Sequence, residues 1–291
     1  MADNDPEKHH FAPRCYIKRW ARPDGKVVEF KRRAHGRVEA RPTATKGTGY
    51  RRNLYTVPGA APGRQNLVES RYLRRVDTEA SLCLDAALGP DAMIPLARRS
   101  HWARFVMRMM RGSPDKVAEV EAKARTSSQT QAQLYQAEWE KLRRPEDPES
   151  WAEAMEVLGE DGLDGFGARA LPKLSDLPRV GEAIVNMKWT IASRAVMPVS
   201  FLTSDKPVVT SNGLARPGAF ILLPISPNTV FMATRDTETI QNFARQFETG
   251  ELIEKLNHTV TAQAHEFVYG QSEDAVGFVE ERLGQYELKT L

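Results

Sequence analysis

Lys26-Val27-Val28-Glu29-Phe30-Lys31 determines the local structure near the N-terminus. This run leads through Ala34-His35-Gly36 into a second run, Arg37-Val38-Glu39-Ala40. β-Branched and aromatic residues favour extended chain in the first run, and the glycine between the two runs suits a turn. Pro23-Asp24-Gly25 is a second turn signal, directly before the first run. The stretch therefore predicts a β-hairpin.

Helical patterns follow the hairpin, and strand patterns return after them. Apolar residues at three- and four-residue spacings predict helices over residues 66–88 and 91–111. Pro114 suits the first turn of a third helix that runs to residue 143, is polar, and has only a thin apolar stripe. The remaining patterns predict helices over 177–196, 236–249 and 251–269, and strands over 199–203, 207–210, 219–223 and 229–233.

Helices in the middle of the chain, with strands toward both ends, indicate an α+β protein. We expect residues 1–8 to form a disordered tail and residues 9–291 to form one domain, from which the polar helix near 115–143 protrudes. The hairpin and the strands near 199–233 would build a small, mainly antiparallel sheet. This arrangement would bring His10 near Asp205.

The composition is that of an ordinary globular protein with a substantial core: 291 residues, 41% of them hydrophobic and 27% charged. The 41 basic and 38 acidic residues give a net charge of +3, too small to demand a nucleic-acid partner. Basic residues are nevertheless dense between Lys8 and Arg75. They form either a positive face for phosphates or a solvated surface of mixed charge.

The cysteines, the first residues and the apolar runs indicate the cellular compartment. Cys15 and Cys83 cannot build a disulfide framework and belong to no CxxC pair, so we expect two buried free thiols. The first seven residues are polar and acidic, unlike a signal peptide. No apolar run approaches the ~20 residues that span a bilayer. The expected protein is cytoplasmic and has no membrane partner.

Three short motifs along the chain together suggest a resemblance to a known family. The first is His9-His10-Phe11-Ala12-Pro13 with Tyr16 and Trp20, the second surrounds Arg108 and Arg111-Gly112-Ser113-Pro114, and the third is Thr203-Ser204-Asp205-Lys206-Pro207, followed by Leu256-Asn257. Together they resemble the uncharacterised, mostly bacterial domain-of-unknown-function family 4238. The resemblance implies an intracellular protein with a shared fold and brings no established activity with it.

The chain departs from that family's pattern at a few positions. Cys15 stands where the family more often has an aromatic or polar residue, and Lys206 replaces a common asparagine. The family's acidic pair is represented by Glu69 together with either Asp77 or Glu79.

His10 is the first catalytic candidate. Adjacent histidines in extended chain point to opposite sides, so one of the pair can face a pocket. We favour His10 over His9, because Phe11 and Pro13 fix the chain just after it. An imidazole changes charge near neutral pH and suits acid/base catalysis or metal ligation. The alternative is a structural histidine that hydrogen-bonds to the backbone.

Two carboxylates complete the predicted catalytic set. Asp205 lies between two expected strands, where it would bind a metal, orient His10 or act as a base. Its alternative is a turn cap, a common role for aspartate before proline. Glu79 is the second, on a helix that also carries Glu69 and Asp77; paired carboxylates can hold Mg²⁺ or share acid/base work. Their alternative is a solvated surface beside neighbouring arginines.

Arg14, Arg111 and Asn257 are the candidate substrate-binding residues. Arg108 and Arg111 lie three residues apart near a helix end, where two guanidinium groups suit a phosphate. Cations also interact favourably with a helix C-terminus, which is the structural alternative. Asn257 lies beside an apolar stripe. The chain contains no Walker A, GxGxxG, HExxH or GxSxG motif.

These residues favour an intracellular hydrolase that acts on a phosphate ester and resembles a nuclease. Its expected partner is nucleic acid or another phosphate-bearing ligand. The cofactor is left open, with a divalent ion such as Mg²⁺ or Mn²⁺ as the candidate. The alternative is a non-catalytic binding or regulatory protein whose motifs are structural and whose helix 115–143 contacts a protein partner. The sequence alone leaves open whether the protein is an enzyme.

Overall fold

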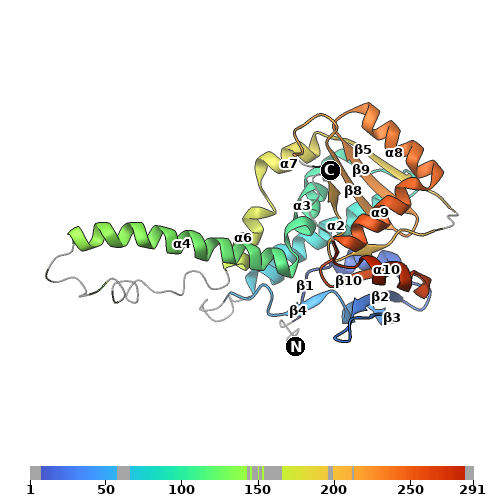
Figure 1. The fold of residues 1–291 in the computed structure, drawn as a ribbon. Coiled ribbons are helices and arrows are strands. Elements are labelled where there is room, and N and C mark those ends of the chain that lie inside the picture. Colours follow the sequence, from blue (N-terminus) through green and yellow to red (C-terminus); the bar gives the residue numbers. More distant parts are fainter. Residues whose placement is uncertain are drawn as a thin grey trace, which may run out of the picture.

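The computed structural model describes residues 8–57, 66–142, 145, 150, 153, 166–195, 199–211 and 213–285. Helices and antiparallel sheets share one body, so the α+β prediction is confirmed (Figure 1). The long helix α4 (Pro114–Leu142) extends away from that body. In the described part of the chain, no helix combines the length and apolar character that crossing a membrane requires. The tail expected over residues 1–8 falls outside the described residues, except for residue 8.

The predicted hairpin is present and forms half of a four-stranded antiparallel sheet. β2 (Lys26–Arg32) pairs with β3 (Val38–Ala44), and β10 (Phe267–Gly270) pairs with the other edge of β2. β6 (Thr203–Ser204) completes the order β3-β2-β10-β6. Val28, Phe30 and Val268 pack together on one face of this sheet.

A second four-stranded antiparallel sheet has the order β5 (Lys188–Ser193), β9 (Thr229–Thr234), β8 (Phe220–Ser226), β7 (Val209–Thr210). Alternate residues of β8 and β9 point to opposite faces, and both faces are buried. Leu223 and Phe231 join the main core. Leu222 and Met232 join a separate cluster with residues of the helices α8 (Thr237–Thr249) and α9 (Glu251–Ala262).

The strands therefore form two four-stranded sheets and a short ribbon, where the sequence predicted one small sheet. Two of the expected helices end early: residues 177–196 divide into α7 (Pro178–Val185) and β5, and residues 251–269 divide into α9 and β10. The last helix among the described residues is α10 (Val276–Arg282). Trp189 and Ile191 suit a strand as well as a helix face, and pairing with β9 decides between the two.

The N-terminal segment lies against the first long helix. β1 (Lys8–His10) pairs with β4 (Tyr50–Arg52) in a two-stranded ribbon, and α1 (Arg14–Ile17) with η1 (Lys18–Trp20) follows β1. The short turn η2 (Thr45–Gly47) precedes β4. The helix expected over 66–88 is present, and it begins with the π-helical segment η3 (Val68–Leu73) before continuing as α2 (Arg74–Ala87). It packs on α3 (Arg99–Arg111).

Candidate functional site

Strand pairing gives the two adjacent histidines different surroundings. In the β1–β4 ribbon, successive side chains point to opposite faces. His9 turns into the core, where its Nδ1 accepts a hydrogen bond of 2.8 Å from the Tyr55 backbone N–H. Its ring stacks on the Tyr55 ring with 5.7 Å between centroids. His10 turns the other way and lines a cavity.

Arg108 fixes the backbone that carries His10. Its guanidinium is buried, and it donates one hydrogen bond of 2.9 Å to the Phe11 carbonyl and another of 2.9 Å to the His10 carbonyl. Its Nε lies 3.3 Å from Oδ1 of Asp77, within ion-pair distance. Arg108 therefore joins the N-terminal segment to α2, and it does not form the phosphate clamp that its spacing from Arg111 suggested. Arg111 does not line this cavity.

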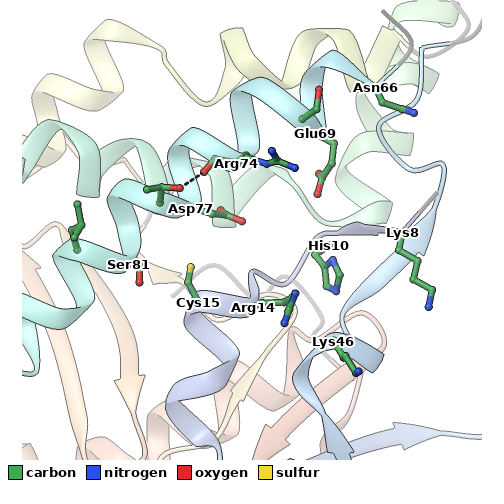
Figure 2. Close-up of a pocket in the computed structure, with 13 residues that line it drawn as sticks. Lys8, His10, Arg14, Cys15, Lys46, Asn66, Glu69, Arg74, Asp77 and Ser81 are labelled. Carbon is green, nitrogen blue, oxygen red and sulfur yellow. Dashed lines mark hydrogen bonds between the residues drawn. The ribbon is translucent and has the colours of Figure 1, made fainter. Parts of the chain in front are cut away.

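The cavity has a volume of about 820 Å³ and lies between the N-terminal segment and the helix formed by η3 and α2 (Figure 2). This volume is within the range of small-molecule sites in proteins. The lining side chains come from both walls and from η2: Lys8, His10, Arg14, Cys15, Lys46, Asn66, Glu69, Ser70, Arg74, Asp77, Thr78, Ser81 and Leu82.

Two carboxylates project into the cavity from the helical wall. Glu69 and Asp77 are eight residues apart, about two turns, and so share a face. Burial raises the pKa of the Glu69 carboxyl to about 7, although the charge of Arg108 opposes the rise. Burial also raises the pKa of Asp77 against the opposing charge of Arg108. Near neutral pH, Glu69 is therefore divided between its protonated and ionised forms.

His10 faces these carboxylates from the other wall (Figure 2). Burial, together with the smaller effect of the charges of Arg14, Arg108 and Lys8, lowers the pKa of its imidazole to about 4, and a hydrogen bond to the Lys46 backbone partly opposes this shift. The imidazole is thus neutral at neutral pH. A negatively charged ligand would favour the protonated form and raise this pKa again.

One polar atom on each wall has no hydrogen-bond partner among the described residues. These atoms are Nε2 of His10 and Oε2 of Glu69, and both are shielded from solvent. Buried polar atoms in folded proteins nearly always have a partner. The pair is therefore a place where a ligand or a water molecule would supply the missing hydrogen bonds.

Cations surround this pair. Lys8, Arg14, Lys46 and Arg74 all line the cavity, against the two carboxylates Glu69 and Asp77. Guanidinium and ammonium groups at this density favour a ligand with several anionic oxygens, such as a phosphate.

Cys15 also lines the cavity, as a free thiol. Burial and, to a smaller extent, the Asp77 charge raise its pKa to about 12. The thiolate is the nucleophilic form of cysteine, so this side chain is unsuited to nucleophilic attack.

Asp205 does not join His10 at this cavity, contrary to the sequence-based expectation. Its Oδ1 accepts a hydrogen bond of 2.8 Å from the His265 backbone N–H, and its Oδ2 accepts bonds of 2.7 Å and 3.0 Å from Glu266 and Phe267. The side chain is buried. This geometry matches the structural alternative, because the carboxylate caps the chain that leads from α9 into β10.

Glu79 and Asn257 also lie away from His10. The Glu79 carboxylate is 2.9 Å from Nη1 of Arg98 and 3.0 Å from Nδ1 of His101, in a separate cavity of about 250 Å³. Asn257 is buried on α9, where its amide bonds to the backbone of residues 200 and 202. Each side chain is held by groups outside the cavity that His10 lines.

Of the six predicted site residues, the structure therefore brings His10 and Arg14 to one cavity. Glu69 and Asp77 take the place expected of Glu79. Their eight-residue spacing indicated a shared face, but the sequence did not show that this face is the one opposite His10.

Within the described residues, no three His, Cys, Asp or Glu side chains are grouped so that they could hold a metal ion by themselves. Mg²⁺ in phosphate-binding sites is commonly held by one or two carboxylates together with substrate oxygens. Glu69 and Asp77 are the carboxylates of this cavity that could take that part.

Comparison with known proteins gives one family. The family described as "Protein of unknown function (DUF4238)" matches residues 8–274. The match covers most of the chain, including both walls of the cavity, and the chain belongs to this family. No curated protein and no solved structure matches it.

Proposed function

We propose that this DUF4238 protein is a hydrolase that acts on a phosphate ester in the cavity between β1 and α2. One observation carries the proposal: an unpartnered imidazole nitrogen of His10 and an unpartnered carboxylate oxygen of Glu69 lie on facing walls, within a ring of cations. A candidate acid and a candidate base at an anion-binding cavity are the minimum that ester hydrolysis requires.

In this proposal, Arg14, Lys46 and Arg74 bind the non-bridging oxygens of the phosphate. Their charges also stabilise the negative charge that the transition state develops on those oxygens. Lys8 lies at the same cavity and adds to the positive potential. Asp77, paired with Arg108, holds that guanidinium and with it the backbone of His10.

The proton transfers follow from the two pKa values. A water molecule attacks phosphorus and gives a proton to Nε2 of His10, which the bound phosphate has made more basic. Protonated Glu69 gives its proton to the leaving oxygen as the bond from phosphorus to that oxygen breaks. A proton then passes from His10 to Glu69 and restores both groups. Because the two atoms are shielded from solvent, both side chains rotate when the substrate binds.

The test is the hydrolysis of p-nitrophenyl phosphate and bis(p-nitrophenyl) phosphate by the full chain, with and without Mg²⁺ and Mn²⁺. Glu69→Gln keeps the shape of the side chain and removes its proton transfer. General acid catalysis contributes about 10²- to 10⁴-fold, so we expect kcat to fall by a factor in this range. The kcat/KM of the native protein should decline above a pH of about 7, where free Glu69 loses its proton.

Glu79→Gln is the matched control, because Glu79 lies further along the same helix and lines a different cavity. Its kcat should stay within about threefold of the native value. Equal losses in the two variants would contradict the assignment of Glu69. Hydrolysis that survives His10→Ala in a folded protein would contradict the assignment of His10.

A different observation favours the second candidate, a non-catalytic binding protein. His9, Arg108, Asp205 and Asn257 belong to the family-like motifs, and all four hydrogen-bond to the backbone. α4 extends from the body, as a surface for a protein partner would (Figure 1). Calorimetric binding of inorganic phosphate without hydrolysis of either ester, under all metal conditions, would decide for this candidate.

A further inference from the structure

One face of the β1–β4 ribbon carries two residues that line the cavity, Lys8 and His10. The strand register places Lys8 opposite Arg52 and His10 opposite Tyr50. Directly opposite residues, and residues two positions along a strand, point to the same side of a ribbon. Lys8, His10, Tyr50 and Arg52 therefore share one face, which carries two cations, an imidazole and an aromatic ring.

The Tyr50 ring contacts two residues that line the cavity, His10 and Lys8. Its centroid is 5.7 Å from the His10 ring, with 53° between the two planes. The Lys8 ammonium lies 5.1 Å from the same centroid, and Lys8 and His10 both line the cavity. Tyr50 is only partly buried. A flat group attached to a phosphate in the cavity could reach this ring.

The size of the cavity indicates a ligand that has a further group attached to its phosphate. The cavity volume of about 820 Å³ lies toward the upper end of the range for small-molecule sites, far beyond the needs of a bare phosphate.

We infer that the ligand is a nucleotide unit, whose phosphate enters the cavity beside His10 and Glu69 and whose base stacks on Tyr50. The base takes the position of the Lys8 ammonium over the ring, and Lys8 turns to the phosphate. This inference rests on the proposed function, since the phosphate of the nucleotide is the group that would be hydrolysed. Aromatic side chains beside cations are the usual means of holding unpaired bases.

The experiment compares three ligands by titration calorimetry on the full chain: inorganic phosphate, ribose 5-phosphate and adenosine 5′-monophosphate. Base stacking on an aromatic side chain should make the nucleotide bind about 5- to 150-fold more tightly than the sugar phosphate. Tyr50→Ala should remove this preference and leave the affinity for inorganic phosphate unchanged. Tyr50→Phe should keep the preference, because the ring remains.

Phe166→Ala is the matched control. Phe166 is a partly exposed aromatic residue on α6 (Phe166–Leu174), and it does not line the cavity. This variant should bind all three ligands as the native protein does. A loss of inorganic phosphate binding in Tyr50→Ala, equal to its loss of nucleotide binding, would show that the ring only supports the fold and would overturn the inference.

Two other outcomes separate this inference from the proposed function. Equal affinity for the nucleotide and the sugar phosphate would overturn base recognition while leaving a phosphate site in place. Failure of all three ligands to bind would remove the phosphate site itself. A single-stranded decanucleotide distinguishes the sources of the nucleotide. If it binds more tightly than adenosine 5′-monophosphate and its affinity depends steeply on salt, the ligand is a nucleic-acid strand. If it binds more weakly, the ligand is a free nucleotide.

Discussion

The variant Glu69→Gln should change how the stability of the protein depends on pH. The carboxyl has a pKa of about 7 in the folded protein, against its ordinary value of 4.5 in the unfolded chain. Below pH 4.5 both states hold the proton, and the native protein has its full stability. As the pH rises toward 7, the unfolded chain releases its proton more readily, so the free energy of unfolding falls.

The size of this loss follows from the two pKa values. At 1.36 kcal/mol for each pKa unit, the difference between about 7 and 4.5 corresponds to about 3 kcal/mol. This value is an upper limit, because the side chain keeps some contact with the solvent of the cavity. An amide does not titrate, so the variant lacks this loss. Any constant effect of the amide cancels between two pH values.

The assay is urea denaturation of both proteins at pH 4.5 and at pH 8, followed by extrapolation to zero urea. Relative to the native protein, Glu69→Gln should be more stable at pH 8 than at pH 4.5 by up to about 3 kcal/mol. If the two proteins lose or gain the same free energy between these pH values, Glu69 does not titrate near neutrality. Its assignment as the general acid would then fail.

Three further variants or reactions have defined outcomes. The dependence of stability on pH has the opposite sign for His10, because its pKa of about 4 in the folded protein lies below the ordinary 6.5. In urea denaturation the native protein should lose stability as the pH falls from 6.5 to 4, and His10→Gln should not show this loss. Asp205→Ala leaves three backbone N–H donors without their acceptor and should lower the free energy of unfolding by about 3 kcal/mol or more in urea, without changing phosphate affinity in calorimetry. Cys15 should resist iodoacetamide at pH 7.5 in the folded protein and react after unfolding, as mass spectrometry would show.

Local patterns in the sequence predicted the hairpin and the first long helix, because both depend on residues close together in the chain. The division into two sheets could not be predicted in this way. β10 pairs with β2, which places Val268 opposite Phe30, and no local pattern records a partner so distant in the chain. The same holds for β5, whose short apolar run suits either a helix or a strand until β9 pairs with it.

The residues of the candidate site also divide into those that the sequence predicted and those that it did not. Strand alternation predicted that one of the two histidines faces a pocket, and His10 does line one. The choice of Glu79 over Glu69 could not be made correctly from the sequence, because it depended on which face of the helix lies opposite His10. That face is determined by Arg108, which links Asp77 to the carbonyls of residues 10 and 11. Nothing in the spacing of Arg108 and Arg111 showed that one is a buried link and the other is outside the cavity.

The contacts that fix the position of His10 support the functional role that we propose for it. β1 has only three residues and pairs with a single short strand, so it contributes little to its own stability. Side-chain hydrogen bonds hold it: Nδ1 of His9 accepts one from the Tyr55 backbone N–H, and the buried Arg108 donates one each to the His10 and Phe11 carbonyls. A buried guanidinium is generally no more stabilising than well-packed apolar side chains would be. Arg108 is therefore better explained by the fixed position that it gives to His10 than by its contribution to folding.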